Sequence, residues 1–417
     1  MRVLVASPSL AQEVGGPAYS VLRTHEELAL ASVESQLITK LGGHGSTSIR
    51  KWARRTPTGA DILHNFGAWT PFNHQVSRWA RRAGVPEVLC PMGMLEPWSL
   101  QQKRWKKRLA WLCYQRQDMH RAAAIHATAK TEAEHLRALG MTNPIAVIPR
   151  GIDLPAESSQ ERFQCRDREE RVLLFLSRIH PKKGLLELVE ACSSLRQHAN
   201  WRLVIAGPDS VNHQAVVTAA VKQAGLANRV EFVGPAWGEA KHKLFLEADV
   251  FVLPSHSENF GVVIGEALAH GLPVITTTGA PWAELCEYRC GWWISTGADP
   301  LKAALEEALS APRSVLSDMG TRGRALVRER YGWPTVVKQH IELYRWIAGS
   351  GPRPAFVSNQ VELPGEETGE RKGSSALRSV AATTPLGPRD RPAAGQNHGY
   401  GLSVAQLDLV GGSPACL

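Results

Sequence analysis

Residues 249–278 contain the pattern that most constrains the fold of this chain. Residues 249–255 form a short apolar run of the kind that a buried parallel strand requires. A polar loop follows at 256–259, then a helical segment that ends at Gly271, and a second apolar run begins at Val274. Strand, loop, helix and strand in this order predict a doubly wound parallel sheet. In such a sheet, ligands bind at the carboxyl ends of the strands.

Two carboxylates in this stretch are candidate ligand-binding groups, Glu258 in the loop and Glu266 in the helix. At about 1.5 Å per helical residue they lie only about 10 Å apart along the chain, which suits one extended ligand such as a sugar nucleotide. The backbone amides of Phe260 and Gly261 would face the same ligand at the helix N-terminus, where anions are favoured. The alternative is that both acids are solvated surface residues. We favour ligand binding, because an unpaired Glu266 would be costly in its nearly all-apolar helix.

The same stretch resembles the signature of the retaining glycosyltransferases of family 4, which have the GT-B fold. That signature is a phrase such as E-G-F-G-x-x-x-x-E-A-x-A-x-G-x-P-V-I. This chain has Glu258-Asn259-Phe260-Gly261, then Glu266-Ala267, Ala269, Gly271 and Pro273-Val274-Ile275. The resemblance implies an α/β chain with two Rossmann-like doubly wound domains that face a cleft. It also implies that Glu258 binds the hydroxyls of the donor sugar and that Glu266 binds the ribose of the nucleotide. Asn259, Phe260 and Gly261 would belong to the same site.

Size and composition agree with a two-domain soluble protein. At 417 residues the chain is too long for one ordinary core, and its 43% apolar and 21% charged residues are typical of globular proteins. No apolar stretch reaches the ~18 residues of a membrane span, and the apolar start ends at Pro8, too early for a signal peptide. We therefore expect a cytoplasmic protein. The net charge of +9 favours anionic partners, but no nucleic-acid-binding motif accompanies it, so nucleic acid is not an expected partner.

The seven cysteines are scattered and odd in number, which implies no disulfide framework. Cys286 and Cys290 lack a second pair of ligands or a nearby histidine cluster, so a zinc site is not expected. We assign no metal site and no cofactor.

The N-terminal part alternates between strand-like and helical segments, which predicts a Rossmann-like acceptor-side domain over 1–155. Gly15 and Gly16 at the first strand-to-helix turn allow close approach to a substrate, although a tight turn alone also requires glycine. They resemble the family's first loop, whose glycines lie near the donor and acceptor cleft. His64 and His126 are expected at strand ends as structural residues. Strands are expected near 2–8, 33–39, 61–65, 85–91, 122–128 and 144–149, and helices over 17–31, 72–83 and 130–139.

Two segments of this domain resemble the family but depart from it at one residue each. Residues 91–98 resemble a P-x-G-M-L-x-P-W segment of members that build bacterial surface polysaccharides, which usually carry His or Arg where this chain has Met92. Residues 150–153 resemble the P-N-G-V-D link between the family's two domains, with Arg150 in place of Asn. The first departure weakens the assignment of an acceptor-side catalytic cation at position 92.

Residues 99–121 form a basic segment, with Lys-Arg-Trp-Lys-Lys-Arg at 103–108. A basic helix with Trp and Leu can lie on an anionic membrane surface. The alternative is a solvated helix whose aromatic residues pack into the N-terminal domain. Cations on both sides of Trp105 favour the membrane, because a core-facing stripe would normally exclude them. A peripheral position on the inner face of the plasma membrane is therefore a further expectation.

A second Rossmann-like domain, which binds the nucleotide sugar, is expected over 156–332, after a polar linker at 157–170. Arg178 and Lys183 flank its first strand-to-helix turn, where a phosphate would meet both cations and the helix amides. Their spacing resembles the family phrase G-R-x-x-x-x-K-G, which implies that both bind the donor diphosphate. Strands are expected at 171–179, 201–207, 230–234, 249–253, 274–278 and 291–295, and helices at 185–195, 212–225, 239–248 and 299–309.

Two more helices are expected to follow, reaching to about Ala348, and a tail after them. The GT-B resemblance implies that a helix over 333–348 crosses back to the first domain. From 349 on, Pro, Gly, Ser, Thr and charged residues dominate and the periodicity is lost, so we expect a disordered tail over 349–417.

These features predict a retaining glycosyltransferase that moves a sugar from a nucleotide-diphosphate donor to a lipid-linked glycan acceptor. We expect it to act in bacterial exopolysaccharide or lipopolysaccharide biosynthesis. Arg178 and Lys183 would neutralise the departing diphosphate, as a metal does in other enzymes. The resemblance implies front-face transfer, in which the leaving phosphate takes the acceptor proton. Two alternatives stay open: a sugar-nucleotide epimerase on the same fold, which would need its own acid–base residues, and an inactive nucleotide-sugar-binding partner subunit, which Met92 and Arg150 support.

Overall fold

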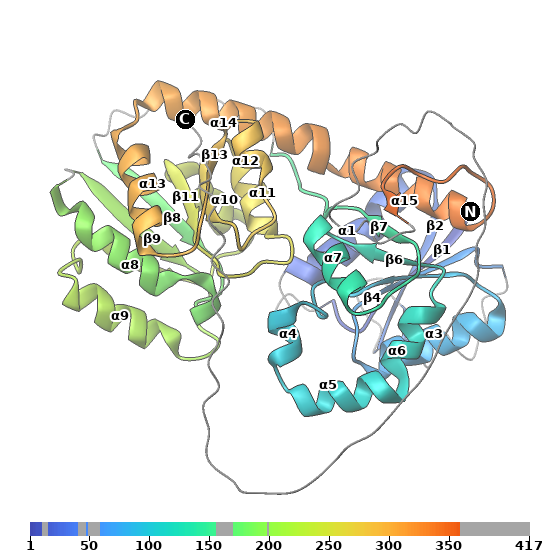
Figure 1. Ribbon diagram of the computed structural model, residues 1–417. Helices are drawn as coiled ribbons and strands as arrows, with labels where there is room; N and C mark the ends of the chain where they lie inside the picture. The colour runs from blue at the N-terminus through green and yellow to red at the C-terminus, as the bar shows by residue number, and fades with distance from the viewer. Residues whose placement is uncertain (11–15, 41–46, 49–58, 156–169, 198–199, 359–417) are drawn as a thin grey trace, which may run out of the picture. The chain divides into compact units, whose positions relative to one another are not determined.

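The computed structural model describes residues 1–10, 16–40, 47–48, 59–155, 170–197 and 200–358 (Figure 1). Gly15 and nearly all of the expected linker at 157–170 lie outside these residues. The described chain forms two mostly parallel sheets with flanking helices, which confirms the predicted fold class of two Rossmann-like units.

The first sheet has eight strands in the order β14-β7-β6-β5-β4-β1-β2-β3. All neighbouring strands are parallel except β14, which is antiparallel to β7. The chain order reverses between β1 and β4, the position at which a doubly wound sheet opens a ligand crevice. The strands are β1 (Arg2–Ser7), β2 (Glu34–Thr39), β3 (Thr47–Ser48), β4 (Ile62–Phe66), β5 (Glu87–Cys90), β6 (Ala124–Ala127), β7 (Ile145–Val147) and β14 (Val357–Ser358).

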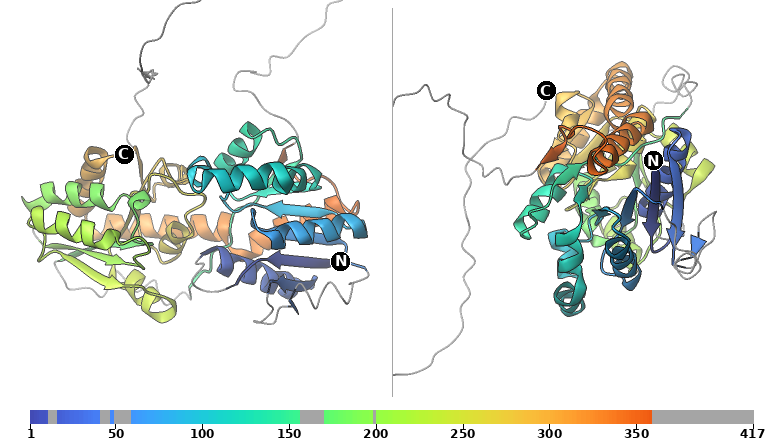
Figure 2. Two further views of the ribbon diagram at one scale, coloured as in Figure 1. Left: turned by 90° about the horizontal axis from the view of Figure 1, so that it is seen from below. Right: turned by 90° about the vertical axis from the view of Figure 1, so that its right-hand side faces the viewer.

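Helices connect these strands on both faces of the sheet (Figure 2). They are α1 (Gly16–Leu30), α3 (Pro71–Ala83), α4 (Pro97–Gln101), α5 (Arg104–Ala110), the π-helix η2 (Trp111–Gln115), α6 (Arg116–Arg121) and α7 (Lys130–Ala138). Local sequence sets their limits, as α3 illustrates. The Thr70 hydroxyl accepts a hydrogen bond from the Asn73 amide at 3.2 Å, Pro71 opens the helix, and Gly84 ends it with φ 68°.

The second sheet has six parallel strands in the order β10-β9-β8-β11-β12-β13, which reverses between β8 and β11. The strands are β8 (Arg171–Leu176), β9 (Trp201–Ala206), β10 (Val230–Gly234), β11 (Val250–Leu253), β12 (Val274–Thr277) and β13 (Gly291–Ile294). The α-helices are α8 (Leu185–Ser193), α9 (His213–Gln223), α10 (Gly238–Glu247), α11 (Val262–Ala269), α12 (Glu284–Glu287), α13 (Ala298–Ser310) and α14 (Arg313–Leu326). Short 3₁₀ turns lie at η4 (Pro181–Lys183) and η5 (Ser194–Gln197), and the π-helix η6 spans Val327–Tyr331.

The last helix, α15 (Trp333–Ile347), follows the second sheet in the chain but packs on the core of the first (Figure 1). Its buried Val336 and Tyr344 share a hydrophobic cluster with Val3 and Val5 of β1. The side chain of Trp333, at the start of α15, lies where a Cβ on Gly151 would stand, 2.3 Å from that position. Gly151 is therefore required where the chain leaves the first sheet.

The sequence suggested a basic helix within 99–121, and the structure has one over 104–121. Lys103 adopts φ 51°, a left-handed conformation that separates this helix from α4, and α5 continues through the π-helical turn η2 into α6. The alternative, in which the aromatic residues of this segment pack into the domain, holds for Trp111, which packs against the core of the first sheet unit, but not for Trp105, which is 68% exposed.

The cysteines depart from expectation at one position. Cys90, Cys113, Cys192 and Cys290 are free thiols, whereas Cys286 takes part in a disulfide. The spacing of the cysteines gave no signal for this bond.

Residues 350–358 correct the prediction that a disordered tail begins at 349. Val357 is only 4% exposed and pairs with Ala146 across the edge of β7, and Phe356 packs against the first core. Arg137 donates a hydrogen bond to the Ser358 carbonyl at 2.8 Å. The prediction rested on the Pro- and Gly-rich composition and overlooked two apolar residues, Phe356 and Val357, that complete this sheet edge. The remainder of the expected tail, 359–417, lies outside the described residues.

A chain that ends at Ser350 should therefore be less stable than one that ends at Gln360. It loses the buried Val357 side chain, which is expected to reduce the free energy of unfolding by about 2 kcal/mol. Thermal unfolding of the full chain and both truncated chains measures the difference. The two truncated chains differ only by residues 351–360, so their comparison isolates the contribution of β14, and equal melting temperatures for both would contradict its structural role.

Candidate functional site

The loops after β8 and β11 meet where the strand order of the second sheet reverses. β8 leads to Arg178 and Lys183, and the neighbouring β11 leads to Glu258. The Lys183 ammonium forms a salt bridge with Glu258 Oε1, and both side chains are nearly buried, 10% and 12% exposed. Ser255 donates a second hydrogen bond to Oε1 at 2.7 Å. The structure therefore brings together two of the three predicted catalytic residues at the crevice of the sheet.

Backbone contacts fix these two loops against each other. Gly184 has φ 71°, and a Cβ at this position would stand 2.1 Å from the Pro254 carbonyl oxygen. The His256 amide donates to the Lys182 carbonyl at 2.9 Å, and the Glu258 amide donates to the carbonyl of Gly279, in the loop after β12, at 2.7 Å. Only glycine permits this approach, so the glycine after Lys183 positions the ammonium beside Glu258.

The local charges keep Glu258 ionised. Burial opposes its ionisation, but the charge and hydrogen bond of Lys183, the Ser255 hydroxyl and the charge of Lys182 hold the pKa of Glu258 below its usual range. Arg178 is exposed, and no carboxylate of the described residues lies within salt-bridge distance of it. Its guanidinium is thus available to an anionic ligand.

Glu266 in α11 is held by a partner that sequence reasoning missed. Lys241 of α10 donates to both of its carboxylate oxygens at 2.6 Å. The two residues are 25 positions apart, and only the packing of α10 beside α11 reveals the pair. Lys182 was missed in the same way, although it adjoins Lys183. Its ammonium lies 4.5 Å from the centre of the Trp98 ring in α4.

The other predicted substrate-binding residues have different placements. Asn259 lies 2.7 Å from Thr128 Oγ1, in a contact between the two sheet units. The Phe260 side chain is 4% exposed and packs on Trp282 and Tyr331, so it fixes the loop rather than lining an open site. Gly261 has φ 78° and caps α11. Gly16 is the first residue of α1, and Gly15 lies outside the described residues.

Met92 and Arg150, which depart from the family phrases, line the same small cavity of about 10 Å³, together with Thr128. Arg150 is 9% exposed, and its Nε has no hydrogen-bond partner among the described residues. Burial lowers the pKa of this guanidinium, while the nearby Cys90, Glu132 and Glu258 raise it. Arg150 therefore places a cationic side chain beside Met92, at a position where the family usually has Asn.

His64, His126 and His340 form the one group of three potential metal ligands that the described residues contain. The His64 Nδ1 atom lies 2.6 Å from the Tyr344 hydroxyl, and the His64 Nε2 atom lies 3.1 Å from His126 Nδ1. The His126 Nε2 atom donates a hydrogen bond to the Ile148 carbonyl at 2.8 Å. Burial lowers the pKa of all three, to about 4 for His126 and about 3 for His340. These neutral rings connect α15 to the first sheet, and we assign them a structural role.

Comparisons with known proteins agree with this fold. Residues 12–151 match the family described as glycosyl transferase 4-like domain, and residues 158–326 match glycosyl transferases group 1. The chain belongs to the family 4 glycosyltransferases of GT-B fold. Arg178, Lys183, Glu258 and Glu266 all fall within the second matched region.

Individual relatives match over part of their length. A GDP-mannose:cellobiosyl-diphosphopolyprenol alpha-mannosyltransferase of Xanthomonas oryzae is 25% identical over 230 residues, 54% of this chain and 59% of the relative. A phosphatidyl-myo-inositol mannosyltransferase of Mycobacterium tuberculosis is 30% identical over 225 residues, 51% of this chain and 56% of the relative. The chain thus spans about half the length of the curated relatives that it matches. The structure of Anabaena HepE in complex with UDP-glucose has the same fold, with a TM-score of 0.65 at 19% identity over 82% of this chain and 99% of HepE.

Proposed function

We propose that this chain transfers a sugar, with retention of configuration, from a nucleotide-diphosphate sugar to a lipid-linked glycan acceptor in bacterial polysaccharide biosynthesis. The observation that carries the proposal is the buried contact between Lys183 and Glu258 at the crevice of the second sheet. The family membership supports the reaction class. The Xanthomonas relative is named for a diphosphopolyprenol acceptor and HepE for a complex with UDP-glucose, which supports both kinds of substrate.

In the proposed reaction, the cations of this site act on the donor diphosphate. Arg178 and Lys183 neutralise the charge that develops as the diphosphate departs, which lowers the barrier most where water is excluded. Glu258 accepts hydrogen bonds from the sugar hydroxyls, and Glu266 accepts them from the ribose. Lys183 and Lys241 occupy these carboxylates in the structure, so donor hydroxyls would share or replace those contacts. The leaving phosphate takes the acceptor proton on the same face.

A screen of sugar nucleotides for thermal stabilisation tests the donor assignment. A ligand present at 100 times its Kd should stabilise the fold by roughly 2.7 kcal/mol. Product analysis with and without a lipid extract then separates transfer from the alternatives. Epimerised sugar nucleotide would indicate an epimerase, and donor binding without any turnover would indicate an inactive partner subunit. Either result would overturn the proposal.

Catalysis at this site should not require added divalent metal. The expected result is unchanged turnover in EDTA, because Arg178 and Lys183 supply the positive charge that Mg²⁺ supplies in other transferases. Initial rates with EDTA and with excess Mg²⁺ or Mn²⁺ provide the measurement. Activity lost in EDTA and restored by either metal would show that the cation pair is insufficient.

We further propose that α5 and η2 attach the protein to anionic membrane. Trp105 is 68% exposed, Leu109 57% and Leu112 78%, and α5 contains no buried residue. Exposed apolar side chains among cations are typical of helices that lie in the membrane interface. No helix in the described part of the chain has the length and apolar character to cross a bilayer.

Charge reversal at Arg104, Lys106 and Arg108 should release the protein from anionic vesicles. Each cation near such a surface contributes about 1 kcal/mol, so three reversals should weaken binding by at least about 100-fold. Lys107 is kept, because its ammonium donates to the Ser99 carbonyl at 2.5 Å. Co-sedimentation of folded protein with phosphatidylglycerol vesicles measures the effect.

The matched control reverses three exposed cations on other helices, Lys222, Arg328 and Lys338, and should bind like the unmodified chain. Higher salt should weaken binding of both the control and the unmodified chain, since the Debye length is about 8 Å at physiological ionic strength. Equal binding by the two charge-reversed variants would refute the proposal for α5.

A further inference from the structure

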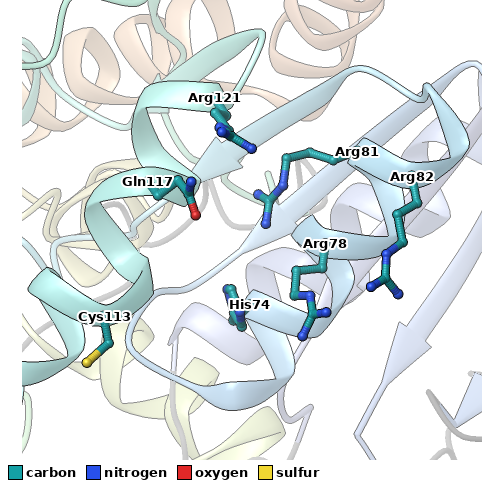
Figure 3. A pocket seen from close by; sticks show the side chains of 7 residues that line it. All are labelled: His74, Arg78, Arg81, Arg82, Cys113, Gln117 and Arg121. Atoms are coloured by element: carbon teal, nitrogen blue, oxygen red, sulfur yellow. The ribbon is translucent and has the colours of Figure 1, made fainter.

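A second basic feature lies on the first sheet unit, between α3 and the η2–α6 segment (Figure 3). It is a hollow of about 400 Å³, within the size range of small-ligand sites. In Figure 3, Arg81 reaches from α3 toward Arg121 and Gln117 on α6, and Arg78 and Arg82 lie along α3. None of the residues assigned to the donor site lines this hollow, which is formed by His74, Arg78, Arg81, Arg82, Cys113, Gln117 and Arg121.

A buried acid organises one side of the hollow. Asp118 is 2% exposed and accepts hydrogen bonds from His74 Nδ1 at 2.7 Å and from Arg81 at 2.8 Å. The His74 ring also lies against Tyr114, with ring centres 4.9 Å apart. These contacts fix part of the lining, so the hollow is a built feature rather than a chance gap between mobile side chains.

The remaining positive charge of the hollow has no counterpart. Arg78, Arg82 and Arg121 are exposed, and no carboxylate of the described residues lies within salt-bridge distance of their guanidinium groups. Arg78 and Arg82 are also four residues apart on one helix, where like charges destabilise each other. These arginines surround a hollow of ligand size despite their mutual repulsion. Such an arrangement fits an anion with several acceptor oxygens. Phosphate suits such a site because planar guanidinium groups bind it with paired hydrogen bonds.

The apolar surface beside the hollow indicates which kind of molecule carries the phosphate. Cys113 lines the hollow, and the preceding residue, Leu112, is 78% exposed at the end of the proposed membrane-binding surface. One short π-helical segment therefore joins exposed apolar side chains to the cluster of arginines. This combination matches a lipid, whose acyl chains and headgroup phosphate lie next to each other.

We propose that the hollow between α3 and α6 binds the headgroup phosphate of an anionic lipid. The inference rests on the membrane attachment proposed above and is separate from sugar transfer, since the hollow contains none of the donor-site residues. It adds a specific lipid contact to an attachment that otherwise depends on general surface charge.

Cys113 provides a direct readout of occupancy. It is an exposed free thiol, whereas the other free cysteines among the described residues, Cys90, Cys192 and Cys290, are buried. The rate at which N-ethylmaleimide modifies the peptide with Cys113 can be followed by mass spectrometry. Vesicles that contain phosphatidylglycerol should slow this modification at least fivefold, and pure phosphatidylcholine vesicles should leave it unchanged.

The arginine requirement is tested with an Arg78→Gln/Arg82→Gln/Arg121→Gln variant. A Lys222→Gln/Arg328→Gln/Lys338→Gln variant is the control, because it removes the same charge from exposed positions elsewhere. The arginine variant should lose the protection of Cys113 and bind phosphatidylglycerol vesicles at least tenfold more weakly, while the control keeps both. Circular dichroism confirms that each variant folds. Equal protection in the two variants would overturn the proposal.

Soluble inorganic diphosphate separates the remaining outcomes. If the α5 surface does not bind membrane but the hollow binds phosphate, diphosphate protects Cys113 and vesicles do not, which overturns the lipid assignment. Protection by duplex RNA but not by vesicles would likewise replace the lipid with a nucleic acid. If neither diphosphate nor vesicles protect Cys113, the hollow is not an anion site. The charge-reversed α5 variant, which retains the hollow, shows whether weak vesicle binding arises from α5 alone.

Discussion

Replacing Lys183 with alanine should abolish sugar transfer and also destabilise the fold, whereas replacing Arg178 should affect transfer alone. Each substitution removes a cation from the departing diphosphate, and the loss of one such contact costs on the order of 3 kcal/mol, or 10²–10³ in turnover. The difference in stability follows from burial. Lys183 is the salt-bridge partner of the nearly buried Glu258, but Arg178 is exposed and pairs with no carboxylate of the described residues.

The stability difference should depend on pH in a defined direction. In the unmodified chain the pKa of Glu258 is held below its usual range, so the ionised group stabilises the fold above pH ~4.3 and loses that contribution as pH falls through its folded pKa. Without Lys183, only the Ser255 hydroxyl and the charge of Lys182 are left to oppose the effect of burial, so the pKa of Glu258 should rise. The Lys183 variant should therefore be less stable than the unmodified chain at neutral pH. This loss of stability should become smaller as Glu258 is protonated at lower pH.

Thermal unfolding from pH 7 to about pH 4 tests this expectation, with Lys222→Ala as the control for loss of an exposed lysine. The difference in melting temperature between the Lys183 variant and the unmodified chain should shrink toward low pH. Unchanged turnover in either the Arg178 or the Lys183 variant would refute the assignment of the diphosphate site. A pH-independent stability difference would refute only the role of the ion pair.

The two regular sheets could be predicted from sequence because their signal is local. Apolar runs such as those of β8 and β11 identify buried parallel strands without knowledge of their partners. The position of Glu258 and Lys183 at one crevice also follows from local information, since both come directly after strands of the same unit. The resemblance to family 4 assigned roles to these positions but did not show that they pair.

Features that depend on distant contacts could not be predicted. Lys241 became visible as the partner of Glu266 only when α10 packed beside α11. The strand at 357–358 was missed because its two residues are stable only against the open edge of β7. The arginine hollow likewise requires α3 and α6 to lie together, and the sequence shows only separate basic segments.

Gly184→Ala should impair both stability and transfer, although glycine at this position contributes no side chain to the site. The φ of 71° costs about 1–2 kcal/mol in an alanine residue. The new methyl group would also stand 2.1 Å from the Pro254 carbonyl oxygen, and backbone must move to relieve this overlap, at about 1–3 kcal/mol more. The loop that moves carries Lys183 away from Glu258, and a displacement of about 1 Å in such a site can lower turnover by 10².

Gly140→Ala is the matched control, since Gly140 has φ 82° and its Cβ would meet nothing within 4 Å. It should incur only the backbone cost and retain full turnover, because Gly140 follows α7 and contacts none of the donor-site residues. Comparison of the two variants in unfolding and in kcat/KM separates the conformational cost of a left-handed residue from the close approach of the two loops. If both variants lose stability equally and both remain active, the contact between Gly184 and Pro254 does not position Lys183.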